Sequence, residues 1–190
     1  EAAFKYKAFM TDENGIEHKM TTIFTTRGCP FNCAFCTTSG IWGRKVRFIP
    51  LQNVRREIEE IAKMGFTALM FYDDILPIDK ERTLKILEIL KGNNLISRIS
   101  VRTDLIIRQV GSKFLQKMCD CGVREVLVGV ESGSNKIKRN IYKGNTIECD
   151  TAVLKWCKEI GISFKCSIVL GLPGETFETL NETRRWLLEN

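Results

Sequence analysis

Residues 67–102 read TALMFYDDILPIDKERTLKILEILKGNNLISRISVR and contain one complete strand–helix–strand pattern. Thr67–Tyr72 is a continuous apolar run of the length and composition typical of a buried strand. Asp79–Lys91 has leucines at helical spacing, and Gly92 is a helix stop. Arg98–Arg102 then predicts the next strand. A strand followed by an amphipathic helix and another strand is the repeating unit of a parallel sheet.

The same unit recurs along the rest of the chain. The strands are expected at Thr21–Thr26, Thr67–Tyr72, Arg98–Arg102, Glu125–Val130 and Ser163–Leu170, and the helices at Asn53–Met64, Asp79–Lys91, Ser112–Asp120, Thr146–Ile160 and Glu175–Leu188. These five strand–helix units predict an α/β fold with right-handed crossovers. A full eight-unit barrel needs about 250 residues, so this chain of 190 residues predicts a partial, open TIM-like barrel of parallel strands.

The chain ends are expected to differ from the repeating part. Two short runs, Phe4–Met10 and Ile16–Met20, flank Asn14-Gly15, which is a strong turn signal, so residues 1–20 predict a short peripheral β-hairpin. Residues 21–190 then form the partial barrel, with the sixth strand–helix unit missing. An uncovered sheet edge would result, through which the chain could associate with itself.

Composition is ordinary for one globular domain, with 44% hydrophobic and 27% charged residues. The net charge of +6 comes from scattered basic residues, which does not favour a nucleic-acid partner. No run approaches the ~18 apolar residues that predict a membrane span. The eight cysteines, without a secretory leader, indicate a cytoplasmic protein with reduced thiols. The start at Glu1, without Met, leads us to expect an excised segment.

Polar residues follow each predicted strand. In chain order they are Cys29, Cys33 and Cys36, then Asp73 and Asp74, then Asp104, then Glu131-Ser132-Gly133, and then Gly171-Leu172-Pro173-Gly174-Glu175. The carboxyl ends of parallel strands share one edge of the sheet, where ligands bind in such folds. The sequence therefore predicts a functional site at this edge.

The three cysteines, in RGCPFNCAFC at residues 27–36, carry the strongest chemical signal. Thiolates are soft ligands suited to iron–sulfur clusters or zinc. Three thiolates around a four-iron cluster leave one iron open for a ligand that is not protein, as a catalytic centre requires.

Two other interpretations stay open at this point. The cysteines could lie on one face of a buried helix, although Gly28, Pro30 and Asn32 disfavour a regular helix. Alternatively, they could bind zinc with a distant fourth ligand, for which His18, Cys119 or Cys121 is available. Cys119, Cys121, Cys149, Cys157 and Cys166 are otherwise interpreted as small buried apolar residues.

The pattern Cys29-x-x-x-Cys33-x-x-Cys36 after the first strand, with Phe35 before the last cysteine, resembles the signature of the radical S-adenosylmethionine (SAM) superfamily. The resemblance covers nearly all of residues 21–190. It implies a 4Fe-4S cluster on the three cysteines and SAM on the open iron. It also implies reductive cleavage of SAM to a 5′-deoxyadenosyl radical, with electrons from a reductant such as flavodoxin or ferredoxin.

The resemblance also implies roles for individual residues. Phe35 would pack beside the adenine, if it is not simply a core residue, and Glu131 would meet the ribose, if it is not a turn residue. Asp73 and Asp74 stand where the family usually has Gly-Gly-Glu, which is a departure from the family's pattern. A carboxylate at this position could still bind the ammonium group that the family's motif binds. The alternative is that these residues cap the next helix, but Asp79 is better placed for that role. The fifth-strand contacts with adenine fall on Ser167, Gly171 and Leu172, and Arg102 and Asp104 would line the pocket.

Within the family, three segments look most like cobalamin-dependent members: Tyr72-Asp73-Asp74, Val130-Glu131-Ser132-Gly133-Ser134 and Gly171-Leu172-Pro173-Gly174-Glu175-Thr176. Cobalamin would then be bound by a domain outside this segment, and the expected reaction is methylation or ring formation at unactivated carbon of a substrate that the sequence does not name. The alternatives are a radical-SAM methylthiotransferase acting on RNA and a non-catalytic zinc-binding module.

Overall fold

The computed structural model describes residues 9–109 and 111–190 and confirms the predicted α/β class. Its main sheet has the strand order β1-β2-β5-β6-β7-β8, in which every neighbouring pair from β2 to β8 is parallel. The strands of this sheet are β1 (Phe9–Thr11), β2 (Glu17–Ile23), β5 (Ala68–Phe71), β6 (Ile96–Val101), β7 (Val123–Glu131) and β8 (Ser163–Ile168). A second, two-stranded sheet pairs β3 (Thr26–Arg27) with β4 (Arg47–Phe48).

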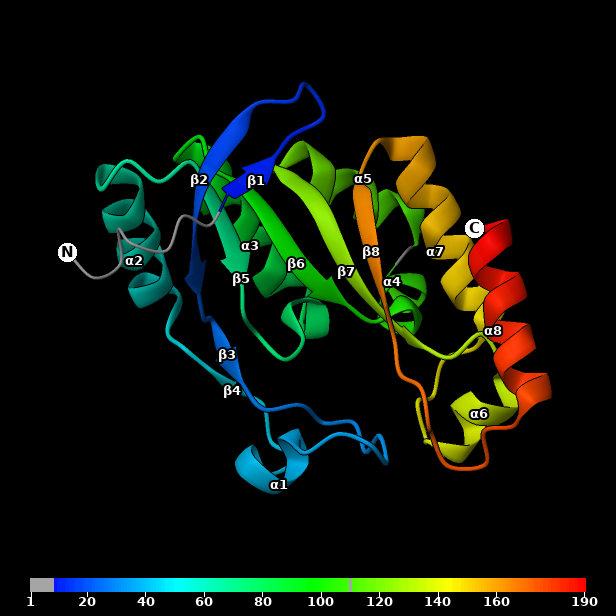
Figure 1. Ribbon diagram of the computed structural model, residues 1–190. Coiled ribbons are helices and arrows are strands. Elements are labelled where there is room, and N and C mark those ends of the chain that lie inside the picture. Colours follow the sequence, from blue (N-terminus) through cyan, green and yellow to red (C-terminus); the bar gives the residue numbers. More distant parts are fainter. Residues whose placement is uncertain (1–8, 110) are drawn as a thin grey trace.

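Helices connect the parallel strands, and the longer of these helices cover one face of the sheet. They are α1 (Thr38–Trp42), α2 (Leu51–Lys63), the 3-10 turn η2 (Leu76–Ile78), α3 (Lys80–Gly92), α4 (Thr103–Arg108), α5 (Ser112–Asp120), α6 (Asn135–Asn140), α7 (Ile147–Ile160) and α8 (Phe177–Glu189). Figure 1 shows the sheet curling in front of α3, α4 and α5, with its other face left open. The partial-barrel prediction is confirmed. No helix among the described residues is both long and apolar enough to span a bilayer.

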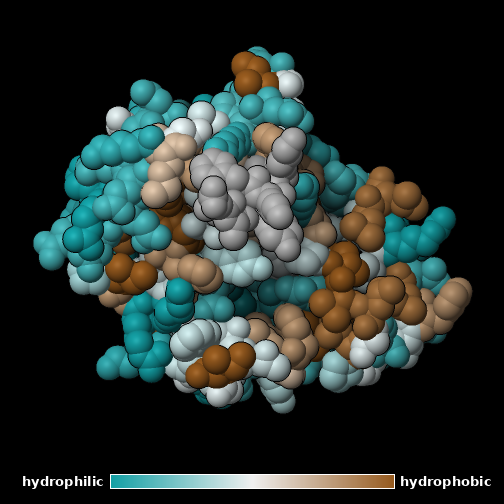
Figure 2. Space-filling model, turned by 60° about the vertical axis from the view of Figure 1, so that its left-hand side comes forward, coloured by the Kyte–Doolittle hydropathy of each residue, from teal (hydrophilic) through white to brown (hydrophobic). Residues whose placement is uncertain are grey.

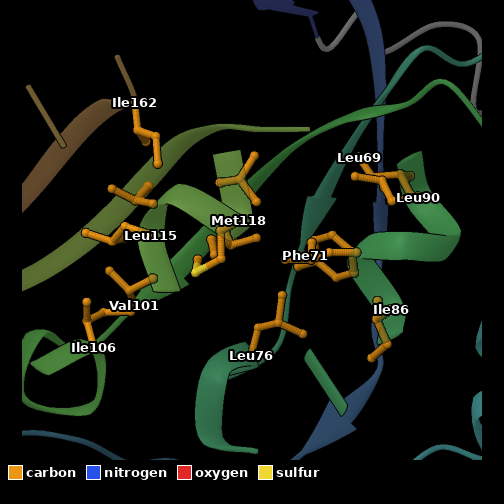
Figure 3. Packing of buried hydrophobic residues seen from close by; sticks show 14 of the residues in the cluster. Leu69, Phe71, Leu76, Ile86, Leu90, Val101, Ile106, Leu115, Met118 and Ile162 are labelled. Carbon is orange, nitrogen blue, oxygen red and sulfur yellow. The ribbon is translucent and has the colours of Figure 1, made fainter. Parts of the chain in front are cut away.

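The core lies between the convex face of the sheet and these helices. In β6, burial alternates along the strand, so that Ile99 and Val101 are buried toward the helices while Arg98 and Ser100 face the open side. Figure 3 shows side chains from strands and helices pointing toward one another, Leu69 and Phe71 against Ile86 and Leu90 among them. This packing fixes the sheet and leaves its concave face available for ligands.

The amino-terminal hairpin differs from the prediction in one respect. Glu17–Ile23 is a single strand that pairs with β1 on one side and with β5 on the other, so the hairpin is part of the main sheet rather than peripheral. Burial of Met10 and Met20 against Ala68 explains why the strand continues without a break. Residues 1–8, which include most of the predicted Phe4–Met10 run, lie outside the described residues.

Loops that follow the strands gather at one end of the molecule, the lower end in Figure 1. Apolar side chains are concentrated toward that end on the face shown in Figure 2. β8 lies at the edge of the main sheet, as expected if the sixth unit is missing. Self-association through this edge stays a prediction.

Candidate functional site

The three cysteines lie on the segment that joins β3 to α1, and the β3–β4 pairing closes the base of this excursion. Gly28 starts the segment with a φ of 93°, a left-handed conformation that favours glycine. A Cβ atom at Gly28 would lie 2.5 Å from the Lys45 carbonyl oxygen. The turn into the cysteine loop therefore requires glycine for both conformation and space. We call residues 28–37 the cysteine loop.

A few polar contacts attach the cysteine loop to the barrel. The Asp74 carboxylate accepts the Gly28 N–H at 2.9 Å and the Thr38 hydroxyl at 3.3 Å. The Ala34 N–H donates to the Ile141 carbonyl at the end of α6, at 2.9 Å. The loop is thus held at both sides of the barrel mouth, between β5 and α6.

One cavity of about 290 Å³ brings most of the predicted site together. Those of its lining residues that the sequence singled out are Cys29, Cys33, Phe35, Cys36, Asp74, Arg102, Glu131 and Ser167. They come from the ends of β5, β6, β7 and β8 together with the cysteine loop. We call this space the cluster cavity. Its contents stay a prediction, but its lining joins thiols to the polar strand ends.

Phe35 is not a core residue. Its side chain is 37% exposed and lines the cluster cavity. The Lys143 ammonium lies 5.7 Å from the centroid of its ring. An exposed aromatic face at a cavity wall is suited to packing against a planar ligand.

Arg102 links the cluster cavity to the cysteine loop. Its guanidinium donates to Cys33 Sγ at 3.5 Å and lies over the Phe31 ring, 3.7 Å from the centroid. Asp104 pairs with it at 3.1 and 3.3 Å, and the Lys143 carbonyl accepts a further bond. Asp104 therefore does not line the cavity but orients Arg102, whose side chain is buried.

Glu131 forms the opposite wall with Lys143, a residue that the sequence did not single out. The Lys143 ammonium donates to Glu131 Oε1 at 2.8 Å, and both side chains are buried. Glu131 has a φ of 65° at a register shift between β7 and β8, and non-glycine residues in this region carry strain of about 1–3 kcal/mol. Nothing in the sequence distinguishes Lys143 from the other lysines, because only the fold brings it to Glu131.

A fully buried polar network supports this wall from behind. Lys138 donates to Asp150 at 2.5 Å and to the Val130 carbonyl at 2.7 Å. Asp150 also accepts from Thr103 at 2.6 Å and from Asn145 at 2.7 Å. Burial lowers the pKa of Lys138 and raises the pKa of Asp150, and the charge of each partner opposes the shift of the other. The network fixes the turn that carries Lys143.

Asp73 has a different role from the one that the resemblance implies. Its carboxylate is 4% exposed and accepts hydrogen bonds from the backbone N–H groups and hydroxyls of Thr25 and Thr26. Burial raises the pKa of Asp73, and these four bonds oppose the shift. Asp73 thus positions the chain entering the cysteine loop, and the exposed Asp74 is the carboxylate that faces the cluster cavity.

Gly171 and Leu172 are not among the residues that line the cluster cavity. Leu172 is buried in a small apolar cluster with Ile137 and Ile141. Gly171 turns the chain after β8 with a φ of 82°. The motif therefore shapes the β8–α8 connection, and only Ser167 of the predicted fifth-strand group reaches the cavity.

Burial raises the pKa of cysteines both inside and outside the cysteine loop. Burial raises the pKa of Cys157 to about 12 and of Cys166 to about 11, and it also raises the pKa of Cys119 and Cys121. Of the five cysteines predicted to be buried, only Cys157 is; Cys119, Cys121, Cys149 and Cys166 are partly exposed, so the prediction is wrong for these four. Burial likewise raises the pKa of Cys29, but the charge of Arg102 opposes that shift.

The three thiols of the cysteine loop line one cavity. Among the described residues, no three Cys, His, Asp or Glu side chains are grouped as ligands of one metal ion. A zinc ion needs its sulfurs within about 2.3 Å of one point, whereas a four-iron cubane spreads its ligands over a larger body. Cys29, Cys33 and Cys36 as cluster ligands stay a prediction, with the cationic Arg102 beside Cys33.

Comparison with known proteins agrees with this geometry. The family model described as Radical SAM superfamily matches residues 23–187. An uncharacterized methyltransferase of Pyrococcus horikoshii is 32% identical over 165 residues, which are 85% of this chain and 35% of that protein. The bacteriochlorophyllide d C-8(2)-methyltransferase of Chlorobaculum tepidum is 27% identical over 182 residues, covering 90% of this chain and 40% of that protein.

A similar fold occurs in the radical SAM methyltransferase TsrM from Kitasatospora setae, solved with cobalamin and a 4Fe-4S cluster bound. The TM-score is 0.79 at 20% identity, over 90% of this chain and 35% of that one. The chain thus spans little more than a third of the length of these proteins. Since the family model matches nearly the whole barrel, the chain belongs to the radical SAM superfamily.

Proposed function

We propose that this chain is the catalytic core of a radical SAM enzyme that methylates, or closes a ring at, an unactivated carbon. The observation that carries the proposal is the cluster cavity, where Cys29, Cys33 and Cys36 meet the polar strand ends. Membership of the superfamily supports the chemistry, and the methyltransferase names of the two relatives support methylation.

The cysteine loop would hold a 4Fe-4S cluster through its three thiolates. When bound, the reduced cluster supplies one electron to SAM, whose C–S bond breaks to give methionine and a 5′-deoxyadenosyl radical. Asp74 would accept the ammonium of SAM, since its exposed carboxylate borders the cavity. Phe35 would pack on the adenine, while Glu131 and Ser167 would bind polar groups of the nucleoside.

Two further components would lie outside these residues. A flavodoxin or ferredoxin would supply electrons, and cobalamin would be held by another part of a longer protein. The cobalamin-bound TsrM structure, with its TM-score of 0.79, supports this arrangement at the level of the fold.

The alternatives have less support. A methylthiotransferase acting on RNA would need a second cluster domain and an RNA-binding domain outside this segment, and the two relatives named above are methyltransferases. A non-catalytic zinc module would not account for the match of residues 23–187 to the radical SAM superfamily model.

Anaerobic reconstitution tests the proposal. We expect a brown protein with about four irons and four sulfides per chain, which yields 5′-deoxyadenosine from SAM and dithionite. A colourless protein that binds one zinc per chain would contradict it. Cobalamin that copurifies with the full-length protein would support the cobalamin-dependent group, and an RNA substrate would support the methylthiotransferase.

A further inference from the structure

A second cavity, of about 590 Å³, adjoins the cluster cavity. Asp74 and Ser100 line both of them, so the two spaces share a wall. The second cavity lies within the volume range of about 300–1,000 Å³ that is usual for small-molecule sites. Because its walls are largely aromatic, we call it the aromatic cavity.

Four aromatic residues line the aromatic cavity; Phe71 among them is buried in the core, and the other three come from separate segments. Phe24 follows β2, Tyr72 follows β5, and Trp42 ends α1. Phe24 and Tyr72 meet edge to face, with centroids 5.5 Å apart and planes at 66°. Tyr72 is 57% exposed and Trp42 is 41% exposed, so much of the aromatic surface has no protein partner among the described residues. Such surfaces bind flat, conjugated molecules by stacking.

Arg27 gives the aromatic cavity its cation. The guanidinium lies on the Phe24 ring, 3.5 Å from the centroid, and one N–H donates to the Thr26 carbonyl at 3.1 Å. The ring contact fixes the plane of the guanidinium while leaving other N–H groups for a ligand. A planar guanidinium held in this way is suited to a carboxylate, which it can bind through two parallel hydrogen bonds.

The two acidic residues that line the aromatic cavity have their oxygens occupied by other donors, which leaves the Arg27 guanidinium for a ligand. The Asp73 carboxylate is engaged by four hydrogen bonds from Thr25 and Thr26. The Asp74 carboxylate accepts from Gly28 and Thr38, on the shared wall. The anion of a ligand is therefore expected at Arg27.

We infer that the aromatic cavity binds the compound that is modified, and that this compound is a planar aromatic or conjugated carboxylate. The inference rests on the proposed function and adds a substrate class to it. The shared wall at Asp74 and Ser100 would place an edge of the flat molecule toward the cluster cavity, while Arg27 holds its carboxylate.

Binding of three probes to the reconstituted protein with SAM tests the inference. The probes are 2-naphthoate, the neutral 2-naphthalenemethanol and the non-aromatic cyclohexanecarboxylate, with dissociation constants measured by calorimetry. We expect 2-naphthoate to bind at least about tenfold more tightly than either of the others, because only it satisfies both ring and cation.

Variants separate the two contributions. Arg27→Gln should weaken 2-naphthoate about tenfold and leave 2-naphthalenemethanol within about twofold, whereas Trp42→Leu should weaken both naphthyl probes. Arg56→Gln, at an exposed position on α2, is the matched control and should change neither. Tyr72→Leu, also at an exposed position, provides a second aromatic test if Trp42→Leu lowers the melting temperature.

Equal binding of cyclohexanecarboxylate, no binding of any probe, or naphthoate binding unaffected by Arg27→Gln and both aromatic variants would overturn the inference. Iron content and 5′-deoxyadenosine are measured on the same preparations. Variant-sensitive naphthoate binding without SAM cleavage would keep the cavity assignment and reject the proposed function. SAM cleavage with variant-insensitive binding would reject the cavity assignment alone.

Discussion

The two walls of the cluster cavity are built in opposite ways. On one side, the cysteine loop is contiguous in sequence and partly exposed, and few hydrogen bonds hold it. On the other side, Glu131 and Lys143 form a buried ion pair in front of a second buried pair, Lys138 and Asp150. The loop wall presents partly exposed thiols, whereas the buried wall has its charges already paired.

The difference indicates how each wall acquires its order. A loop with exposed thiols gains much of its rigidity from the group that it binds, because metal binding and local folding are coupled. Buried, hydrogen-bonded ion pairs are rigid without a ligand, since each partner would be costly to leave alone. We therefore expect the buried wall to be preformed and the loop wall to depend on the cluster.

Replacing a loop thiol should give the largest effect, and on activity rather than stability. Cys33→Ser removes one of three cluster ligands, so iron content should fall and 5′-deoxyadenosine formation should drop more than about 100-fold. The unfolding free energy of the cluster-free protein should change by less than about 0.5 kcal/mol, because the side chain is partly exposed.

Cys149→Ser, a partly exposed cysteine outside the cluster cavity, is the control for this experiment and should retain iron. Full iron content and activity in Cys33→Ser would contradict the assignment of the ligands.

Breaking an ion pair of the buried wall should instead lower the free energy of unfolding. Lys138→Met leaves the Asp150 carboxylate buried without its ion partner, so the unfolding free energy should fall by about 3–5 kcal/mol in urea titrations. Lys136→Met, on the same helix but at a more exposed position, should cost less than about 1 kcal/mol. A similar small loss for both variants would show that the network is not important for stability.

Arg102 joins the two walls, and its loss should have an intermediate effect on both. Arg102→Gln removes an N–H···S bond to Cys33 and leaves Asp104 without its partner, with a cost of about 1.5–3 kcal/mol. Losing a cation beside the thiolates should also make the cluster potential more negative, measured by an EPR-monitored redox titration. Arg108→Gln, at an exposed position on α4, the helix that follows Arg102, should shift neither quantity.

The smallest expected effects on stability come from a pair of matched Thr→Val substitutions, one beside each wall. Thr103→Val removes a buried hydroxyl that donates to Asp150 at 2.6 Å and should cost about 1–2 kcal/mol. Thr38→Val removes a hydroxyl 3.3 Å from Asp74 and should cost less than about 0.5 kcal/mol. Chemical denaturation of both cluster-free variants checks this, and equal costs would argue against the contrast between the walls.

Local sequence was sufficient for the repeating architecture and for the cysteine loop. The strand and helix units follow from periodicity, which is a property of neighbouring residues, and Asp79 caps α3 as its position suggested. Cys29, Cys33 and Cys36 lie within eight residues, so the sequence alone could predict that they lie close together.

Tertiary structure alone decided which charged residues belong to the site. Lys143 reaches Glu131, and Asp73 turns away to Thr25 and Thr26, because strands far apart in sequence are adjacent in the sheet. Leu172 packs against Ile137 and Ile141, which also lie far from it in the sequence. A residue type and its neighbours indicate what a side chain can bind, but burial and partners decide what it does bind, and both depend on contacts between distant segments.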